Sequence, residues 1–162
     1  MRPATLAWVR AGLVALAVVV LDQLAKALVR SSVGAGEEHA LFPGVHIVHV
    51  HNEGVAFSAL KGAGTLVAII IAAAVIALLV YFARHATKPL VWLPTGMLVG
   101  GALGNIVDRV REGYVTDFIK LPAWPAFNVA DMAITFGVVL LLFVVERANG
   151  RDGYPDGAAG EA

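Results

Sequence analysis

Six polar residues with chemically useful side chains lie in a chain whose neighbouring stretches are apolar. They are Asn105, Asp108, Arg109, Asp117, Asn128 and Asp131. An ionisable side chain in a bilayer costs several kcal/mol unless it is paired, hydrated or used, with roughly 2.5 to 3.5 kcal/mol for an Asp or Arg at the centre. Two aspartates brought to one membrane boundary therefore suggest a functional site. The simpler alternative is that they are only helix caps and loop charges.

Local spacing explains most of these residues without a site. Asn105, Asp108 and Arg109 stand at i, i+3 and i+4, so they share one face of a helix, where an Asp–Arg pair could satisfy itself. Asn128 and Asp131 fit the N-cap and N3 positions of the next helix. We expect more than pairing and capping because the end of one helix and the start of the next lie at the same membrane face.

A small β platform is predicted at that face. β-branched residues at 45–50 indicate a strand, with a turn at 52–54, and 114–119 could be a second short strand. Asp117 lies in this second strand, where an exposed aspartate alone would need no explanation. The convergence of strand, helix end and helix start favours a functional site.

The composition indicates a membrane protein of one domain, residues 1–162. The chain is 59% hydrophobic and 15% charged, against about 45–50% and about 25% in soluble domains. The net charge is zero, which argues against a nucleic-acid partner. The chain has no cysteine, which excludes disulfides, thiol nucleophiles and cysteine-based metal sites.

Four apolar stretches are long enough to cross a bilayer. They cover about residues 11–29, 64–82, 89–107 and 129–145, each near the ~20 residues that a membrane helix needs. We therefore predict an all-α integral membrane protein, a bundle of four transmembrane helices. The tail at 149–162 is rich in Gly, Ala, Asp and Pro, and we expect it to be disordered.

The first stretch has an alternative interpretation as a secretory signal peptide. Arg2 and Arg10 precede it, and Ala25-Lys26-Ala27 resembles a small-residue cleavage site. A lysine inside the cleavage triplet is awkward, however, and Asp22 and Lys26 stand at i, i+4, where they can pair. We favour a retained helix.

Basic residues give the expected orientation. At one set of helix ends lie Arg2, Arg10, Arg84, Lys88, Arg147 and Arg151. At the other lie Arg30, Lys61, Arg109, Arg111 and Lys120. This weak bias favours both termini in the cytoplasm, with Trp92 and Trp124 as interfacial anchors.

Three histidines on the first predicted strand invite a metal interpretation. His49 and His51 share a face, while His46 points the other way. No carboxylate stands nearby at helical spacing, so we expect solvated strand histidines and no metal.

Five blocks in order along the chain resemble signal peptidase II, the bacterial lipoprotein signal peptidase. They are Asp22-Gln23-x-x-Lys26, Asn52-x-Gly54-x-Ala56-Phe57-Ser58, Gly100-Gly101-Ala102-x-Gly104-Asn105-x-x-Asp108-Arg109, Val115-x-Asp117-Phe118-Ile119 and Phe127-Asn128-x-Ala130-Asp131. Any one block is weak, but five in order with matching hydropathy are specific. Only the first ten residues and the tail after Glu146 fall outside the resemblance.

The resemblance implies an intramembrane aspartyl endopeptidase with Asp117 and Asp131 as its catalytic dyad. The residues it implies around the dyad are Asn52, Gly54, Asn105, Asp108, Arg109 and Asn128, with Asp22 and Lys26 organising the first helix. The implied substrate is a prolipoprotein that carries diacylglycerol on its lipobox cysteine, cleaved just before that cysteine. The implied location is the bacterial inner membrane, with membrane lipid around a monomer and the site toward the extracytoplasmic face. No cofactor is implied.

The chemistry of two close carboxylates fits this implication. Such a pair should hold one proton, with Asp131 the favoured anion because it lies near a helix N-terminus. The segment at 41–60 could cover the site and move to admit substrate. A small proton-coupled transporter is the main alternative, although its site should lie near the midplane between repeats, and none is visible. A non-catalytic assembly factor would need no such polar cluster.

Overall fold

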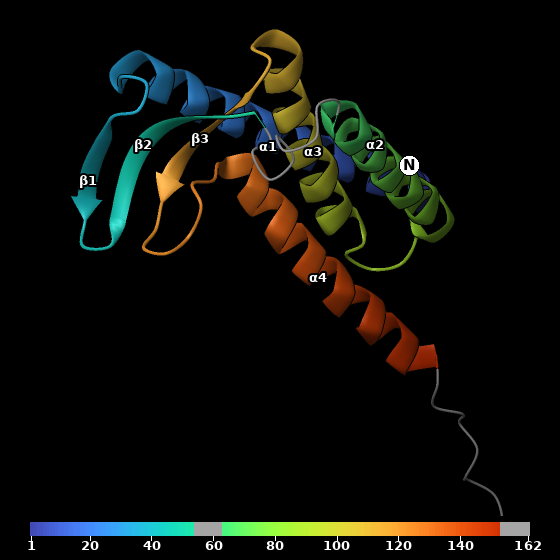
Figure 1. Ribbon diagram of the computed structural model, residues 1–162. Coiled ribbons are helices and arrows are strands. Elements are labelled where there is room, and N and C mark those ends of the chain that lie inside the picture. The colour runs from blue at the N-terminus through green and yellow to red at the C-terminus, as the bar shows by residue number, and fades with distance from the viewer. Residues whose placement is uncertain (54–62, 153–162) are drawn as a thin grey trace, which may run out of the picture.

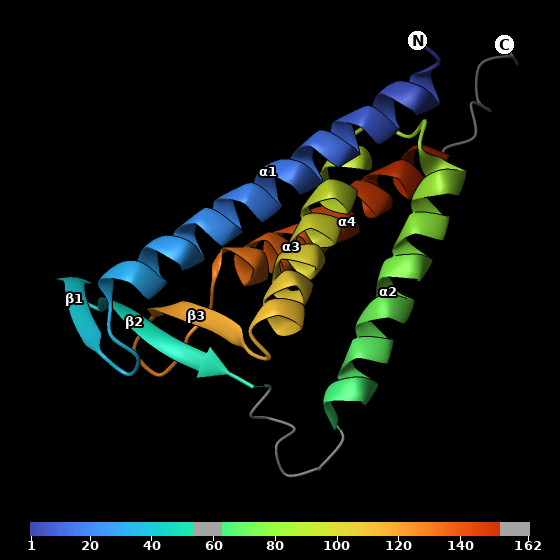
Figure 2. The same ribbon diagram turned by 90° about the horizontal axis from the view of Figure 1, so that it is seen from above.

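The computed structural model describes residues 1–53 and 63–152, which form a helical bundle with a small sheet at one end (Figure 1). In chain order the elements are α1 (Pro3–Ser32), β1 (Glu38–Phe42), β2 (Val45–Asn52), α2 (Ala63–His85), α3 (Trp92–Arg111), β3 (Val115–Lys120) and α4 (Val129–Asp152). The residues that end α1 and α3 and those that begin α2 and α4 lie toward the sheet (Figure 2). The helices therefore alternate in direction, and the polar blocks of the sequence meet at one end.

α3 is the central helix, and glycines let it approach both neighbours closely. A Cβ added to Gly100 would lie 2.7 Å from the carbonyl oxygen of Ala15 in α1, and one added to Gly101 would lie 2.5 Å from that of Ala130 in α4. No side chain fits at such distances, so glycine allows the three backbones to touch. These contacts fix the start of α4 against the middle of α3.

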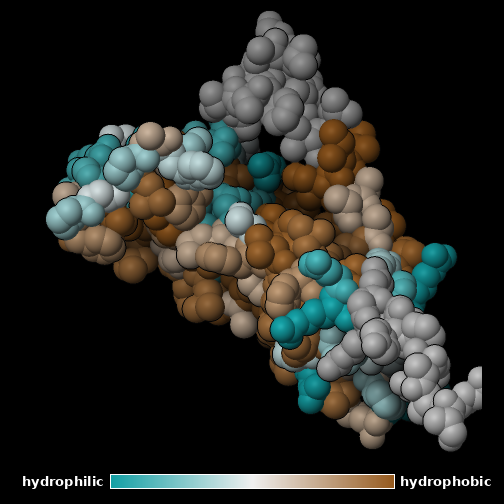
Figure 3. All heavy atoms as spheres, turned by 90° about the horizontal axis from the view of Figure 1, so that it is seen from below, coloured by the Kyte–Doolittle hydropathy of each residue, from teal (hydrophilic) through white to brown (hydrophobic). Residues whose placement is uncertain are grey.

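Apolar clusters close both ends of the bundle. Away from the sheet, buried Ala7 and Ala11 of α1 pack with Phe82 of α2, with Val144 of α4 and with Val91, which directly precedes α3. At the sheet end, Val29 and Val33 pack with Phe118 of β3, so the sheet is joined to the end of α1. On the face shown in Figure 3, the surface over the helices is mostly apolar, with hydrophilic residues at the sheet and toward the opposite end.

The sheet is antiparallel with the order β1-β2-β3. β2 and β3 correspond to the predicted strands, and their register pairs Val50 with Asp117 and Asn52 with Val115. This register places Asn52 beside Asp117. β1 was not predicted. The segment at 41–60, expected to cover the site, contains the end of β1 and all of β2 as far as Asn52. Residues 54–62 lie outside the described part of the chain.

Two of the described helices are long and apolar enough to cross a membrane, Pro3–Ser32 and Val129–Arg147. α2 contributes a shorter apolar stretch, Ile69–His85. α1 runs without a break through Lys26, so the cleavage triplet of the signal-peptide alternative lies inside a helix. α4 continues to Asp152, and its last turn takes up the first residues of the predicted disordered tail.

The expectation of solvated strand histidines is wrong for His49. Its side chain is 8% exposed, and its Nδ1 lies 2.8 Å from the carbonyl oxygen of Val33. The reason is that the sheet packs on the end of α1, which covers this side chain. His51 stacks on Tyr114, with ring centroids 3.9 Å apart. Among the residues that the structure describes, no group of three or more His, Asp or Glu side chains could hold a metal ion.

Candidate active site

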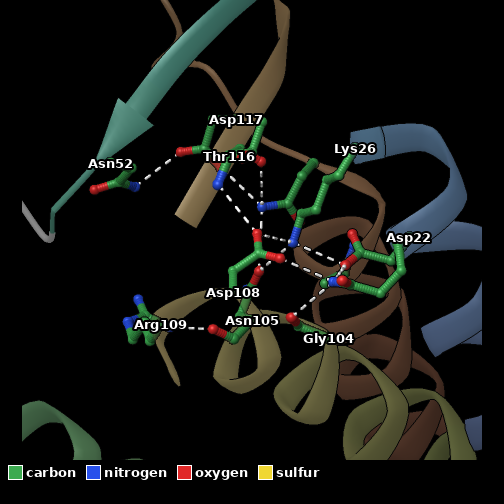
Figure 4. Close-up of polar contacts among 12 residues, drawn as sticks. Asp22, Lys26, Asn52, Gly104, Asn105, Asp108, Arg109, Thr116 and Asp117 are labelled. Atoms are coloured by element: carbon green, nitrogen blue, oxygen red, sulfur yellow. Dashed lines mark hydrogen bonds and ion pairs between the residues drawn. The ribbon is translucent and has the colours of Figure 1, made fainter. Parts of the chain in front are cut away.

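A buried ion-pair cluster joins α1 to α3. Lys26 Nζ lies 2.8 Å from Asp22 Oδ2 and 2.9 Å from Asp108 Oδ2, and all three side chains are at most 1% exposed (Figure 4). The predicted i, i+4 pair of Asp22 and Lys26 is therefore formed. Asp108 pairs with this lysine across the helix interface. The alternative of an Asp108–Arg109 pair within one helix is therefore wrong.

Neutral donors complete the coordination of Asp108. Gln23 Nε2 donates to its Oδ1 at 2.9 Å, and the backbone N–H of Thr116 donates to its Oδ2 at 3.1 Å. Arg30 Nη1 donates to Thr116 Oγ1 at 3.1 Å and lies 4.0 Å from Asp108 Oδ1. Asp108 therefore ties the beginning of β3 to α1 and α3.

Two asparagines connect this cluster to the dyad of the sequence analysis. Asn105 Oδ1 accepts from Lys26 Nζ at 3.1 Å, and Asn105 Nδ2 donates to Asp131 Oδ1 at 2.8 Å. Asn128 Nδ2 donates to Asn105 Oδ1 at 3.2 Å and to Asp117 Oδ1 at 2.7 Å. One continuous network therefore runs from α1 through α3 to both aspartates.

Asp131 lies in the first turn of α4 and caps it together with Asn128. The backbone N–H of Asp131 donates to Asn128 Oδ1 at 3.0 Å, and the backbone N–H of Asn128 donates to Asp131 Oδ2 at 3.3 Å. This reciprocal arrangement is a capping box, and the helix N-terminus favours a negative charge there. Asp131 uses Oδ2 for the cap and presents Oδ1 to Asn105, so it can cap the helix and also belong to the dyad.

Asp117 projects from β3 toward the same place and is 2% exposed. Asn52 Nδ2 donates to its Oδ2 at 2.8 Å from the neighbouring strand. Burial, together with the charge of Asp131, raises the pKa of Asp117 from its ordinary 3.8 to about 6, against the lowering effect of Asn52, Asn128 and Lys26. Such a pKa lets this carboxyl exist in both protonation states near neutral pH, as acid–base catalysis requires.

The other residues of the sequence prediction have different surroundings. Arg109 Nη1 donates to the backbone carbonyl of Asn105 at 3.3 Å, within its own helix, and lies at the edge of the cluster (Figure 4). Gly54 lies outside the described residues.

Three residues of this site were not among the predicted site residues. Thr116 is fully buried between Asp108 and Arg30, and Gln23 bridges Asp108 and the Gly104 carbonyl. Gly104 leaves room for Asp22, because a Cβ there would lie 2.7 Å from Asp22 Oδ2. Gln23 and Gly104 stand inside the quoted blocks, whereas a buried threonine next to an aspartate gives no signal in one sequence.

Comparisons with known proteins agree with the resemblance. The family model for signal peptidase (SPase) II matches residues 14–146, which include the whole cluster. The chain belongs to the signal peptidase II family. A lipoprotein signal peptidase of Moorella thermoacetica is 39% identical over 143 residues, which cover 87% of this chain and 95% of that protein. One of Syntrophomonas wolfei is 43% identical over 131 residues, which cover 80% of this chain and 88% of that protein.

Two solved structures of bacterial membrane enzymes have a similar fold. A bacterial membrane enzyme solved at 2.3 Å is similar with a TM-score of 0.77 and 30% identity, covering 94% of this chain and 93% of that one. A second, solved at 1.9 Å, has a TM-score of 0.73 and 33% identity over 83% of this chain and 91% of that one. Membership of the signal peptidase II family identifies the chain as a peptidase in a membrane, and the transporter alternative finds no support.

Proposed function

We propose that this chain is an aspartic endopeptidase with Asp117 and Asp131 as its catalytic pair. The observation that carries the proposal is Asn128, which donates from Nδ2 to Asp117 and from its backbone N–H to Asp131. One residue in contact with both carboxylates brings them together at the end of the bundle. Two such carboxyls resist simultaneous ionisation, so the pair holds one proton.

The reaction divides two tasks between the aspartates. The ionised carboxylate, Asp131, takes a proton from a water molecule that attacks the scissile carbonyl carbon, while Asp117 gives its proton to the carbonyl oxygen. The tetrahedral intermediate then expels the amino group of the following residue, which takes its proton from Asp131, while Asp117 takes back the proton from the former carbonyl oxygen, so that both carboxyls return to their starting states. Asn52, Asn105 and Asn128 hold the two carboxylates in place, and positioning of this kind contributes several kcal/mol to catalysis.

The proposed substrate is a prolipoprotein that carries diacylglyceryl on the cysteine after the scissile bond. The named relatives are lipoprotein signal peptidases. An apolar groove of about 550 Å³ also supports this substrate. α2, α3 and α4 line it almost entirely with apolar side chains, which suit an apolar segment or an acyl chain. Its lining includes Val75, Leu78, Leu98, Ala102, Ile134 and Val138. Ala102 and Ile134 of this lining lie three positions along α3 and α4 from Asn105 and Asp131, so this end of the groove is about one helical turn from the proposed site.

We further propose that all four helices span the inner membrane, with both termini cytoplasmic. The alternating directions of the helices support this arrangement, as does Trp124, which is 63% exposed near the sheet, where an interfacial aromatic residue is favoured. The chain has no cysteine, so Glu38→Cys and Lys88→Cys each give one thiol. A membrane-impermeant maleimide should label only Glu38→Cys in intact spheroplasts, and the reverse labelling would overturn the orientation.

The function is tested with purified protein in detergent and a prolipoprotein supplied with or without diacylglyceryl. We expect cleavage of the bond before the cysteine in the lipidated substrate, read by mass spectrometry of both products. Rapid cleavage of the unlipidated form would contradict the substrate assignment. Failure of the folded protein to cleave either form would contradict the proposed function.

The pH dependence follows from Asp117. Its pKa of about 6 means that the carboxyl loses its proton as the pH rises through that value. Because the proposed acid must be protonated, kcat/KM should fall about tenfold per pH unit on the alkaline side of pH 6. The measurement is kcat/KM from pH 5 to 8 with the lipidated substrate, since this ratio reports the free enzyme. A flat profile over this range would remove Asp117 from the role of acid.

A further inference from the structure

Lys26 has a contact that its charge does not require. The ammonium is fully buried and meets three oxygens, on Asp22, Asp108 and Asn105. It has three N–H donors and no acceptor, so these contacts use all of them. The two carboxylates account for the burial of a cation, whereas the amide of Asn105 adds nothing to the charge balance.

The contact with Asn105 decides which end of its amide faces each neighbour. Lys26 can only donate, so Oδ1 must face it, and Asn128 Nδ2 donates to the same oxygen at 3.2 Å. The amide nitrogen is then directed at Asp131, 2.8 Å from its Oδ1. A reversed amide would place N–H against two donors and its oxygen against a carboxylate, which costs three hydrogen bonds.

We propose that Lys26 is a positioning residue for the dyad: through Asn105 it keeps an N–H donor on Asp131, favours the ionised form of that carboxylate, and leaves the shared proton to Asp117. The inference rests on the proposed aspartic mechanism. A hydrogen bond donated to the charged form of an acid favours that form. The relay would therefore decide which aspartate acts as base and which as acid.

Charged groups from four elements face this relay in the described part of the chain. Asp22 and Arg30 lie on α1, Asp108 and Arg109 on α3, Asp117 on β3 and Asp131 on α4. Asp22 and Asp108 balance Lys26 and Arg30. The effect on Asp131 therefore depends on the direction of the Asn105 amide more than on net charge around the lysine.

The simpler explanation is that Lys26 only holds α1 to α3, and a single Lys26→Met change cannot separate the two. It would leave Asp22 and Asp108 without their buried partner and could prevent folding. Two matched double variants avoid this problem, K26M/D22N and K26Q/D22N. Both lose one charge of each sign, but the glutamine retains an N–H donor toward Asn105, whereas methionine has none.

The decisive measurement is the acidic limb of the pH profile of kcat at saturating lipidated substrate. We expect this limb to move to higher pH by about one unit in K26M/D22N, the size of one hydrogen bond to a charged group. A smaller shift is expected in K26Q/D22N, since glutamine is shorter than lysine. Glu38→Gln serves as a control, because it removes an exposed carboxylate of β1 and leaves Lys26 and Asn105 untouched. The acidic limb of its pH profile should stay in place.

The outcomes separate positioning from support. A folded K26M/D22N whose acidic limb is unmoved overturns the proposal, and so do equal shifts in the methionine and glutamine variants. A second measurement needs no activity: infrared titration, without substrate, of the carboxyl band that Asp131→Asn removes. If the parent protein cleaves nothing, the proposed function fails, yet this titration still tests the relay. A higher midpoint in K26M/D22N supports the relay, and an unchanged midpoint overturns it.

Discussion

Asp117→Asn is expected to lower the rate of cleavage roughly 10²- to 10⁴-fold, the range that a positioned acid or base contributes. The asparagine keeps the shape of the side chain, and its one carbonyl oxygen can still accept from Asn52 or Asn128, which now donate to the two carboxylate oxygens. It cannot give up a proton to a carbonyl oxygen. The measurement is single-turnover cleavage of the lipidated prolipoprotein, which reports the chemical step.

Two further variants make this prediction specific. The double variant D117N/D131N should be little worse than either single variant, because residues that act as a unit are not additive. Glu38→Gln, an exposed carboxylate in β1 of the same sheet, should cleave at the parental rate. Asp117→Asn with more than about a tenth of the parental rate would argue that the carboxyl is structural.

Asp117→Asn should lower the rate of cleavage but raise the stability of the folded protein relative to the parent as the pH increases. The folded-state pKa of Asp117, about 6, lies above its ordinary value of 3.8, so the folded protein binds this proton more tightly than the unfolded one. The contribution of Asp117 to stability is complete below pH 3.8 and is lost as the pH rises through 6. Thermal unfolding in detergent should therefore favour Asp117→Asn over the parent more at pH 8 than at pH 4.

The polar residues could be placed on helix faces from the sequence, but their partners could not. Spacing puts Asn105, Asp108 and Arg109 on one face of α3, and it puts Asp22 next to Lys26. Which residues lie across from that face depends on how close α1 comes to α3, and glycines along α3 set that distance. Asp108 therefore pairs with Lys26, which lies 82 positions earlier in the chain and on another helix. Residue spacing along a single helix cannot predict such a partner.

The sheet shows where local signals end. β2 and β3 carry β-branched residues that predict strands, whereas β1 is exposed along its whole length and has no alternation of polar and apolar residues. Its strand conformation depends on the free edge of β2, which offers backbone partners. The burial of His49 likewise depends on the carbonyl of Val33 at the end of α1, a contact between elements.

Gly101→Ala should be among the most damaging single changes in the bundle. Its Cβ would lie 2.5 Å from the carbonyl oxygen of Ala130 and 2.7 Å from Ile134 Cγ1. A backbone oxygen cannot turn away like a side chain, so α4 must move, at a cost of about 1 to 3 kcal/mol in the free energy of unfolding. Ala130 precedes Asp131, and a misplacement of about 1 Å can cost roughly 10²-fold in rate. Thermal unfolding and single-turnover cleavage test the two effects.

Gly12→Ala is the matched control, since it adds the same methyl group to a helix glycine with no atom within 4 Å of the new Cβ. It should keep the parental rate, and its unfolding temperature should equal or exceed the parental one, because alanine is favoured over glycine inside a helix. If Gly101→Ala lowers stability but not the rate, the dyad tolerates movement of α4, and its geometry must then be held by Asn128 and Asn105. If it changes neither, α3 and α4 are not packed at the distance on which the whole site depends.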